Sequence, residues 1–83
     1  MKLTIKFIDS SLKYGVYHNK KNIAILFDSR EDAIKWSSKA EEFYIKYIND
    51  YLTIDRIAED YNISNTLAEN IINIGKYINN KRS

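Results

Sequence analysis

Residues 53–78 of this 83-residue chain, TIDRIAEDYNISNTLAENIINIGKYI, have the pattern of two short helices joined by a tight turn. The apolar residues follow one helical stripe up to Tyr61, break at Asn62 and resume after Ser64. Asn62 suits the break because asparagine tolerates the left-handed backbone conformation that a sharp turn needs. Ser64 suits the restart because its hydroxyl can cap the free N–H groups of a new helix. The stretch therefore predicts a helical pair with a short connection.

The N-terminal third of the chain predicts strands. Apolar and polar residues alternate across Leu3–Phe7 with the period of a half-buried strand. Two further runs, Leu12–Tyr17 and Ile23–Phe27, flank the polar tip His18–Asn22, which is typical of a β-hairpin. We expect His18, the only histidine, to be a solvated residue of this tip.

A long helix is predicted after the strands. Ser29 followed by Asp32 approximates a capping box, which stabilises a helix start. Aromatic and small residues then recur at three- and four-residue intervals, and Asn49-Asp50 is the expected stop. The apolar stripe of this helix comprises Ala33, Trp36, Ala40, Phe43, Tyr44 and Tyr47.

The length of the chain supports one domain, because 83 residues provide a single modest core. The predicted class is α+β, with a small N-terminal antiparallel sheet of about three strands, one long helix and then the helical pair. The predicted segments are strands with a basic hairpin at 1–28, the long helix at 29–49, the helical pair at 53–78 and a polar tail at 79–83.

Composition narrows the classes of function. The chain has no cysteine, which excludes disulfides and cysteine-ligated zinc. It has no apolar run of about 20 residues, and its start lacks the features of a signal peptide, so we expect a cytoplasmic protein without a membrane partner. No glycine-rich phosphate loop, nucleophile–base combination or metal-ligand spacing is present. We therefore expect no enzyme, no cofactor and no metal site.

The apolar spacing across Asn62 resembles the helix-turn-helix superfamily of DNA-binding proteins, in residues 53–78 only. Ala58 and Ala68 are small, which lets two helices cross closely. In that family the second helix lies in the major groove of double-stranded DNA. The resemblance implies a small transcription regulator, acting as a homodimer on a palindromic site. The dimer contact is expected either along the long helix or by edge pairing of the N-terminal strands.

The resemblance also implies which side chains meet DNA. Outward-facing residues of the last helix would contact bases and phosphates: Asn pairs with adenine, Glu accepts from cytosine and Thr touches a thymine methyl group. No arginine lies on this face, so the implied target is AT-rich. The candidate DNA-binding residues are Ser64, Asn65, Thr66, Glu69, Asn70, Asn73 and Lys76.

The distribution of charge along the chain does not favour DNA binding by the helical pair. Residues 1–22 carry five lysines and one aspartate, a net charge of +4, whereas residues 51–83 carry four basic and four acidic residues, a net charge of zero. DNA-binding segments normally carry a positive surplus, because neutralising phosphates supplies much of the affinity. The basic hairpin tip is comparable to the wing of winged helix-turn-helix proteins, or it keeps a turn soluble and protects a sheet edge. Possible phosphate or partner contacts are Lys13, Tyr17, Lys20 and Lys21.

A second interpretation is a protein-binding inhibitor or adaptor. Ile, Asn, Lys and Tyr are over-represented, and their codons are AT-rich. The chain is similar in style to small accessory proteins of phages and other mobile elements, some of which block host defence nucleases, including those of CRISPR systems. The partner would then be a host protein or ribonucleoprotein. The weak charge of the last helix favours this interpretation, whereas the apolar spacing across Asn62 favours the first.

Overall fold

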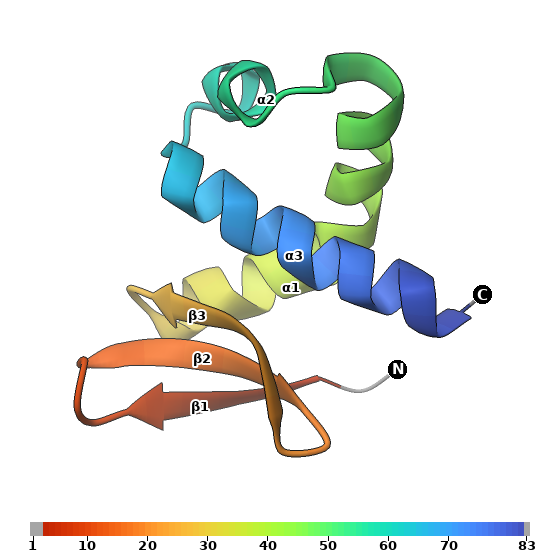
Figure 1. Ribbon diagram of the computed structural model, residues 1–83. Coiled ribbons are helices and arrows are strands. Elements are labelled where there is room, and N and C mark those ends of the chain that lie inside the picture. The colour runs from red at the N-terminus through yellow and green to blue at the C-terminus, as the bar shows by residue number, and fades with distance from the viewer. Residues whose placement is uncertain (1–2, 83) are drawn as a thin grey trace.

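Three strands are followed by three α-helices, in the order expected from the sequence, and an unexpected π-helical turn follows the first helix (Figure 1). The computed structural model describes residues 3–82, apart from the side chains of residues 24–26 and 82. The elements are β1 (Thr4–Ile8), β2 (Lys13–His18), β3 (Lys21–Phe27), α1 (Arg30–Lys46), a π-helical turn η1 (Tyr47–Tyr51), α2 (Ile54–Tyr61) and α3 (Asn65–Arg82). The predicted α+β class is confirmed.

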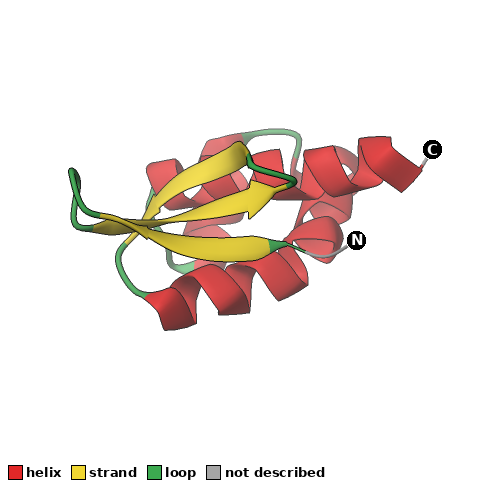
Figure 2. Ribbon diagram, turned by 90° about the horizontal axis from the view of Figure 1, so that it is seen from below, coloured by secondary structure: helices red, strands yellow, loops and turns green. Residues whose placement is uncertain are grey.

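The strands form one antiparallel sheet in the order β1-β2-β3. Viewed from the sheet side, the helices all lie behind one face of the sheet (Figure 2). Ile5 of β1 pairs with Val16 of β2, and both contribute to the core beneath the helices. Because side chains alternate along a strand, the residues on either side of Ile5 and Val16 point to the opposite face.

The β2–β3 hairpin turns more tightly than predicted. Asn19 and Lys20 have φ values of 50° and 70°, which a two-residue type I′ turn requires. His18 and Lys21 pair with each other as the last residues of the two strands. The tip therefore consists of two residues rather than the predicted His18–Asn22.

Helix α1 begins as predicted and ends at Lys46, where a π-helical turn continues the helical path. Ser29 caps it, since the Ser29 hydroxyl accepts a hydrogen bond of 3.0 Å from the Asp32 N–H. The chain then enters η1, where the Leu52 N–H donates to the Tyr47 carbonyl at 2.7 Å. This wide i+5 hydrogen bond extends the helical path by one turn. The helical path therefore ends at Tyr51, one residue beyond the stop expected at Asn49-Asp50.

The core lies between the inner face of the sheet and the helices. The predicted stripe of α1 is confirmed, because four of its members are buried and two are half-buried against them. Burying one large aliphatic side chain contributes about 1.5–3 kcal/mol. The buried core residues are Val16, Phe27, Ala33, Trp36, Ala40, Phe43, Ile57, Ala58, Ala68, Ile71, Ile72 and Ile74.

Helices α1 and α3 cross closely at Gly75. A Cβ atom at this position would overlap the backbone carbonyl oxygen of Ala40 and lie 2.5 Å from the Cβ atom of Tyr44. Gly75 is helical, so it is required here for the close approach and not for backbone flexibility. The crossing therefore joins the second half of α1 to the middle of α3.

Helix α3 also extends further than expected. We predicted residues 79–83 as a polar tail, but α3 continues to Arg82. Ile78 packs against the core and Tyr77 bonds to His18 on the sheet, so tertiary contacts hold the last turns of the helix. None of the helices within residues 3–82 combines the length and apolarity needed to cross a membrane.

Replacing Gly75 with alanine is expected to destabilise the protein by about 1–3 kcal/mol, because overpacking at this crossing forces α1 and α3 apart. Urea unfolding followed by circular dichroism measures the change. Asn73→Ala is the matched control, since it adds an alanine to an exposed site on the same helix and should leave stability nearly unchanged. Equal stability of the two variants would mean that the helices do not cross this closely.

Candidate functional site

The turn between α2 and α3 has the two local features that the sequence predicts. Asn62 adopts the left-handed conformation, with φ 56° and ψ 48°, and the Ile63 N–H donates to the Ala58 carbonyl at 3.0 Å. These features close the end of α2. Ser64 then caps α3, because its hydroxyl accepts a hydrogen bond of 3.1 Å from the Leu67 N–H. Three residues, 62–64, thus connect the helices.

The two helices are joined by a small apolar seam. Ile57 and Ala58 of α2 are buried in the same cluster as Ala68 and Ile71 of α3. The alanines permit close packing at this end of α3, as the sequence predicts. The seam orients α3 so that its opposite side faces outward.

A polar stripe on α3 faces solvent. Thr66, Glu69, Asn73 and Lys76 are all exposed, and their three- and four-residue spacing places them on one side of the helix. We call these four residues the outer stripe. They are four of the seven candidate DNA-binding residues that the sequence predicts on this helix and its cap.

The other nominated residues of α3 are engaged within the protein. The Asn65 side-chain amide donates to the Asp55 carboxylate at 2.5 Å. Asn70 is half-buried and lines, with Lys13 and Asp28 among others, a hollow of about 330 Å³ between α3 and the ends of the strands. The expectation that Asn70 points outward is therefore wrong, because the sheet lies beside this turn of the helix. Ser64, the third, is exposed but serves as the helix cap.

Lys13 and Tyr17 do not form a joint surface with the hairpin tip. Lys13 makes an ion pair with Asp28. It lies four residues, or about 13 Å, along β2 from Tyr17. Tyr17 is half-buried, and the ammonium nitrogen of Lys6 lies 5.5 Å from the centroid of its ring. Tyr17 therefore belongs to the uncovered face of the sheet and not to the α3 surface.

The hairpin tip packs against the last turns of α3. His18 Nδ1 and the Tyr77 hydroxyl lie 2.7 Å apart, and their rings meet edge to face at 5.5 Å. The ammonium nitrogens of Lys21 and Lys81 lie 5.4 Å and 5.5 Å from the Tyr77 ring centroid. The expectation of a solvated His18 is wrong, because the hairpin folds onto the helix and half-buries it. We call Lys21 and Lys81 at the Tyr77 ring, together with the exposed Lys20 of the adjoining turn, the basic cluster.

The lysines of the basic cluster have no acidic partner among the described side chains. Among the described side chains, the ion pairs join Lys13 to Asp28 and Lys46 to Glu42. Each exposed cation–π contact contributes about 0.5–1 kcal/mol, which holds the ammonium groups near the ring without neutralising them. The cluster is therefore a local excess of positive charge, suited to an anion.

Sequence reasoning missed Tyr77 and Lys81 as site residues. One local signal was present, since a tyrosine and a lysine four residues apart on a helix are neighbours. The contact with His18 and Lys21 has no such signal, because His18 and Tyr77 are 59 positions apart in the chain.

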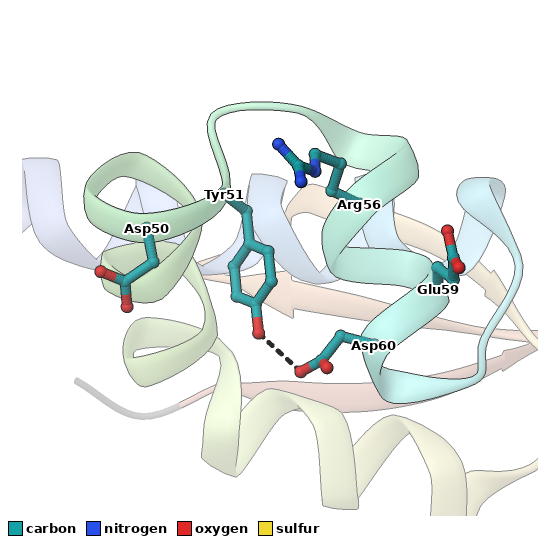
Figure 3. A pocket seen from close by; sticks show the side chains of 5 residues that line it. All are labelled: Asp50, Tyr51, Arg56, Glu59 and Asp60. Carbon is teal, nitrogen blue, oxygen red and sulfur yellow. Dashed lines mark hydrogen bonds between the residues drawn. The ribbon is translucent and has the colours of Figure 1, made fainter.

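The outer face of α2 is acidic instead. Asp50, Tyr51, Arg56, Glu59 and Asp60 line an open hollow of about 500 Å³ between η1 and α2 (Figure 3). The Tyr51 hydroxyl donates to Asp60 at 2.5 Å. This hydrogen bond to a carboxylate raises the pKa of Tyr51 to about 12. Three carboxylates against one guanidinium group make this face negative.

Comparison of the chain with models of protein families, with curated proteins and with solved structures finds no match. The function must therefore be argued from the geometry. Within residues 3–82, no three His, Asp or Glu side chains gather in a way that could hold a metal ion. Among the polar surfaces of the described residues are the outer stripe with its basic neighbour and the acidic face of α2.

Replacing Asn62 with alanine is expected to cost about 1 kcal/mol of stability, because alanine adopts the left-handed conformation less readily than asparagine. Thermal unfolding measures the loss. Asn62→Gly is the matched control and should retain most of the stability, since glycine adopts this conformation freely. If alanine and glycine behave alike, the turn does not use this conformation.

Tyr51 is expected to remain protonated at a pH where ordinary tyrosines ionise. Its proton makes the bond to Asp60, so the bond is present below the pKa and is lost as the pH rises through about 12. NMR of ¹³Cζ-labelled tyrosine measures this titration, with Tyr51→Phe identifying the signal. Asp60→Asn should lower the pKa of Tyr51 toward 10. An unchanged pKa in this variant would contradict the assigned hydrogen bond.

Proposed function

We propose that the protein is a small cytoplasmic DNA-binding regulator of helix-turn-helix type, which reads an AT-rich site with α3. The main observation in favour is the exposed outer stripe, which the turn at 62–64 and the apolar seam hold outward. The stripe spans eleven residues, from Thr66 to Lys76, which is a rise of about 15 Å along the helix. This length suits a few consecutive base pairs in a major groove.

The chemistry of the outer stripe favours particular bases. Asn73 is suited to bidentate pairing with adenine, and Thr66 to contact with the methyl group of thymine. Glu69 accepts a hydrogen bond from the amino group of cytosine, while Lys76 meets phosphate. The stripe has no arginine, the usual partner of guanine, which supports an AT-rich target.

A regulator of this size would act as a dimer. One helix reads only a few base pairs, and two copies related by a two-fold axis read a palindrome with half-sites about one helical turn apart. The spacing of half-sites recovered by selection would reveal this symmetry.

The acidic face of α2 favours a second candidate function, that of an inhibitor or adaptor bound to a host protein or ribonucleoprotein. Glu59 and Asp60 would repel DNA phosphates, but they complement a basic protein surface. Leu52, which is 68% exposed beside this face, adds an apolar contact of the kind found in protein interfaces. In this alternative α3 is a scaffold.

Selection of duplexes from a randomised DNA pool, with binding measured by fluorescence anisotropy at two salt concentrations, tests the proposal. We expect enrichment of a defined AT-rich site. Asn73→Ala should then weaken discrimination at one base position by about 1–3 kcal/mol. Lys39→Ala on α1 is the control and should leave base preference unchanged.

Failure to enrich any site would overturn the proposal and favour the protein-binding alternative. Enrichment with the same base preference in wild-type protein and Asn73→Ala would retain DNA binding but contradict readout by the outer stripe.

A further inference from the structure

We infer that the basic cluster at Tyr77 is a binding site for the phosphate backbone of duplex DNA, beside the bases that α3 reads. The inference rests on the proposed function and assigns the residues that contact the DNA backbone. In the helix-turn-helix pattern the first helix of the pair crosses the backbone. Here that contact is made by the β2–β3 hairpin and the end of α3.

The fold brings together positive charges from distant parts of the chain. Lys21 comes from β3 and Lys81 from the last turn of α3, yet both ammonium groups lie within 5.5 Å of the centre of one tyrosine ring. Lys20 occupies the adjoining turn and is exposed. None of the three has an ion pair among the described side chains. Several unpaired positive charges in one region attract an anion more strongly than a single one does.

The basic cluster is already formed before a ligand binds. The 2.7 Å contact between His18 and the Tyr77 hydroxyl fixes the ring against the hairpin. The pairing of His18 with Lys21 fixes the hairpin end, and the left-handed turn at Asn19 and Lys20 sets its direction. A preformed site loses less conformational entropy on binding than a flexible one.

The basic cluster lies next to the outer stripe. Tyr77 directly follows Lys76, the last residue of the stripe, and lies on the flank of α3 that contacts the sheet. A helix in the major groove has phosphates along both flanks, since the groove is only about 12 Å wide. A lysine group on this flank therefore lies where one strand of the backbone passes.

The other flank of α3, on the side of α2, carries acidic residues. Helix α2 packs against the start of α3, and its exposed face carries Asp55, Glu59 and Asp60 against Arg56. This face repels phosphates. Of these two flanks, the hairpin side carries the lysines of the basic cluster, from which counterion release gains affinity.

The experiment measures the salt dependence of affinity for two fluorescein-labelled duplexes, the selected site and a scrambled version. Lys21→Gln and Lys81→Gln should each reduce the magnitude of the slope of log K against log salt concentration by about 0.9, the value for one lost phosphate contact. Both should weaken binding of the two duplexes by the same factor, because phosphate contacts carry no sequence information. Lys39→Gln, an equal change of charge on α1, should alter neither quantity.

The outcomes separate this inference from the proposed function. If wild-type protein binds neither duplex at low salt, DNA binding itself is wrong. If wild-type protein binds and the Lys21 and Lys81 variants keep its slope, DNA binding stands but the cluster is not the phosphate site. All three positions are exposed, and equal thermal unfolding of the variants would show that the fold is retained.

Discussion

The close crossing of α1 and α3 at Gly75 is the constraint on which the rest of the structure depends. Because Gly75 lacks a side chain, its backbone lies directly against Ala40 and Tyr44. The crossing directs one side of α3 into the core and leaves the outer stripe exposed. It also brings the last turns of α3 over the sheet, where Tyr77 meets the hairpin. A wider crossing would separate the two parts of the proposed interface.

The same fold gathers opposite charges in separate places on the surface. Helix α2 and η1 place Asp50, Glu59 and Asp60 around one hollow. The hairpin and the end of α3 place Lys21 and Lys81 at one tyrosine ring. The net charge of +2 conceals this separation. Neither the net charge nor the charge of the helical pair alone therefore describes how charge is arranged on this surface.

Predictions that depended on a few neighbouring residues were confirmed. Ser29 and Ser64 cap their helices, and Asn62 forms the left-handed turn, because each role involves hydrogen bonds within about four residues of the chain. Errors occurred where distant contacts compete with local preference. The polar residues 79–82 would favour a frayed end, but α3 continues to Arg82 because Tyr77 is bonded to the sheet.

The sequence by itself determined the α+β class, the order of the strands and helices, the turn at Asn62 and the four exposed residues of the outer stripe. These follow from periodicity and capping, which act over one or two helical turns. Only the tertiary structure decided that the basic hairpin lies against α3, that His18 and Asn70 are half-buried, and that α2 is the acidic flank. The physical reason is that packing of the core sets which distant residues meet, and the local patterns of this chain do not specify such pairs.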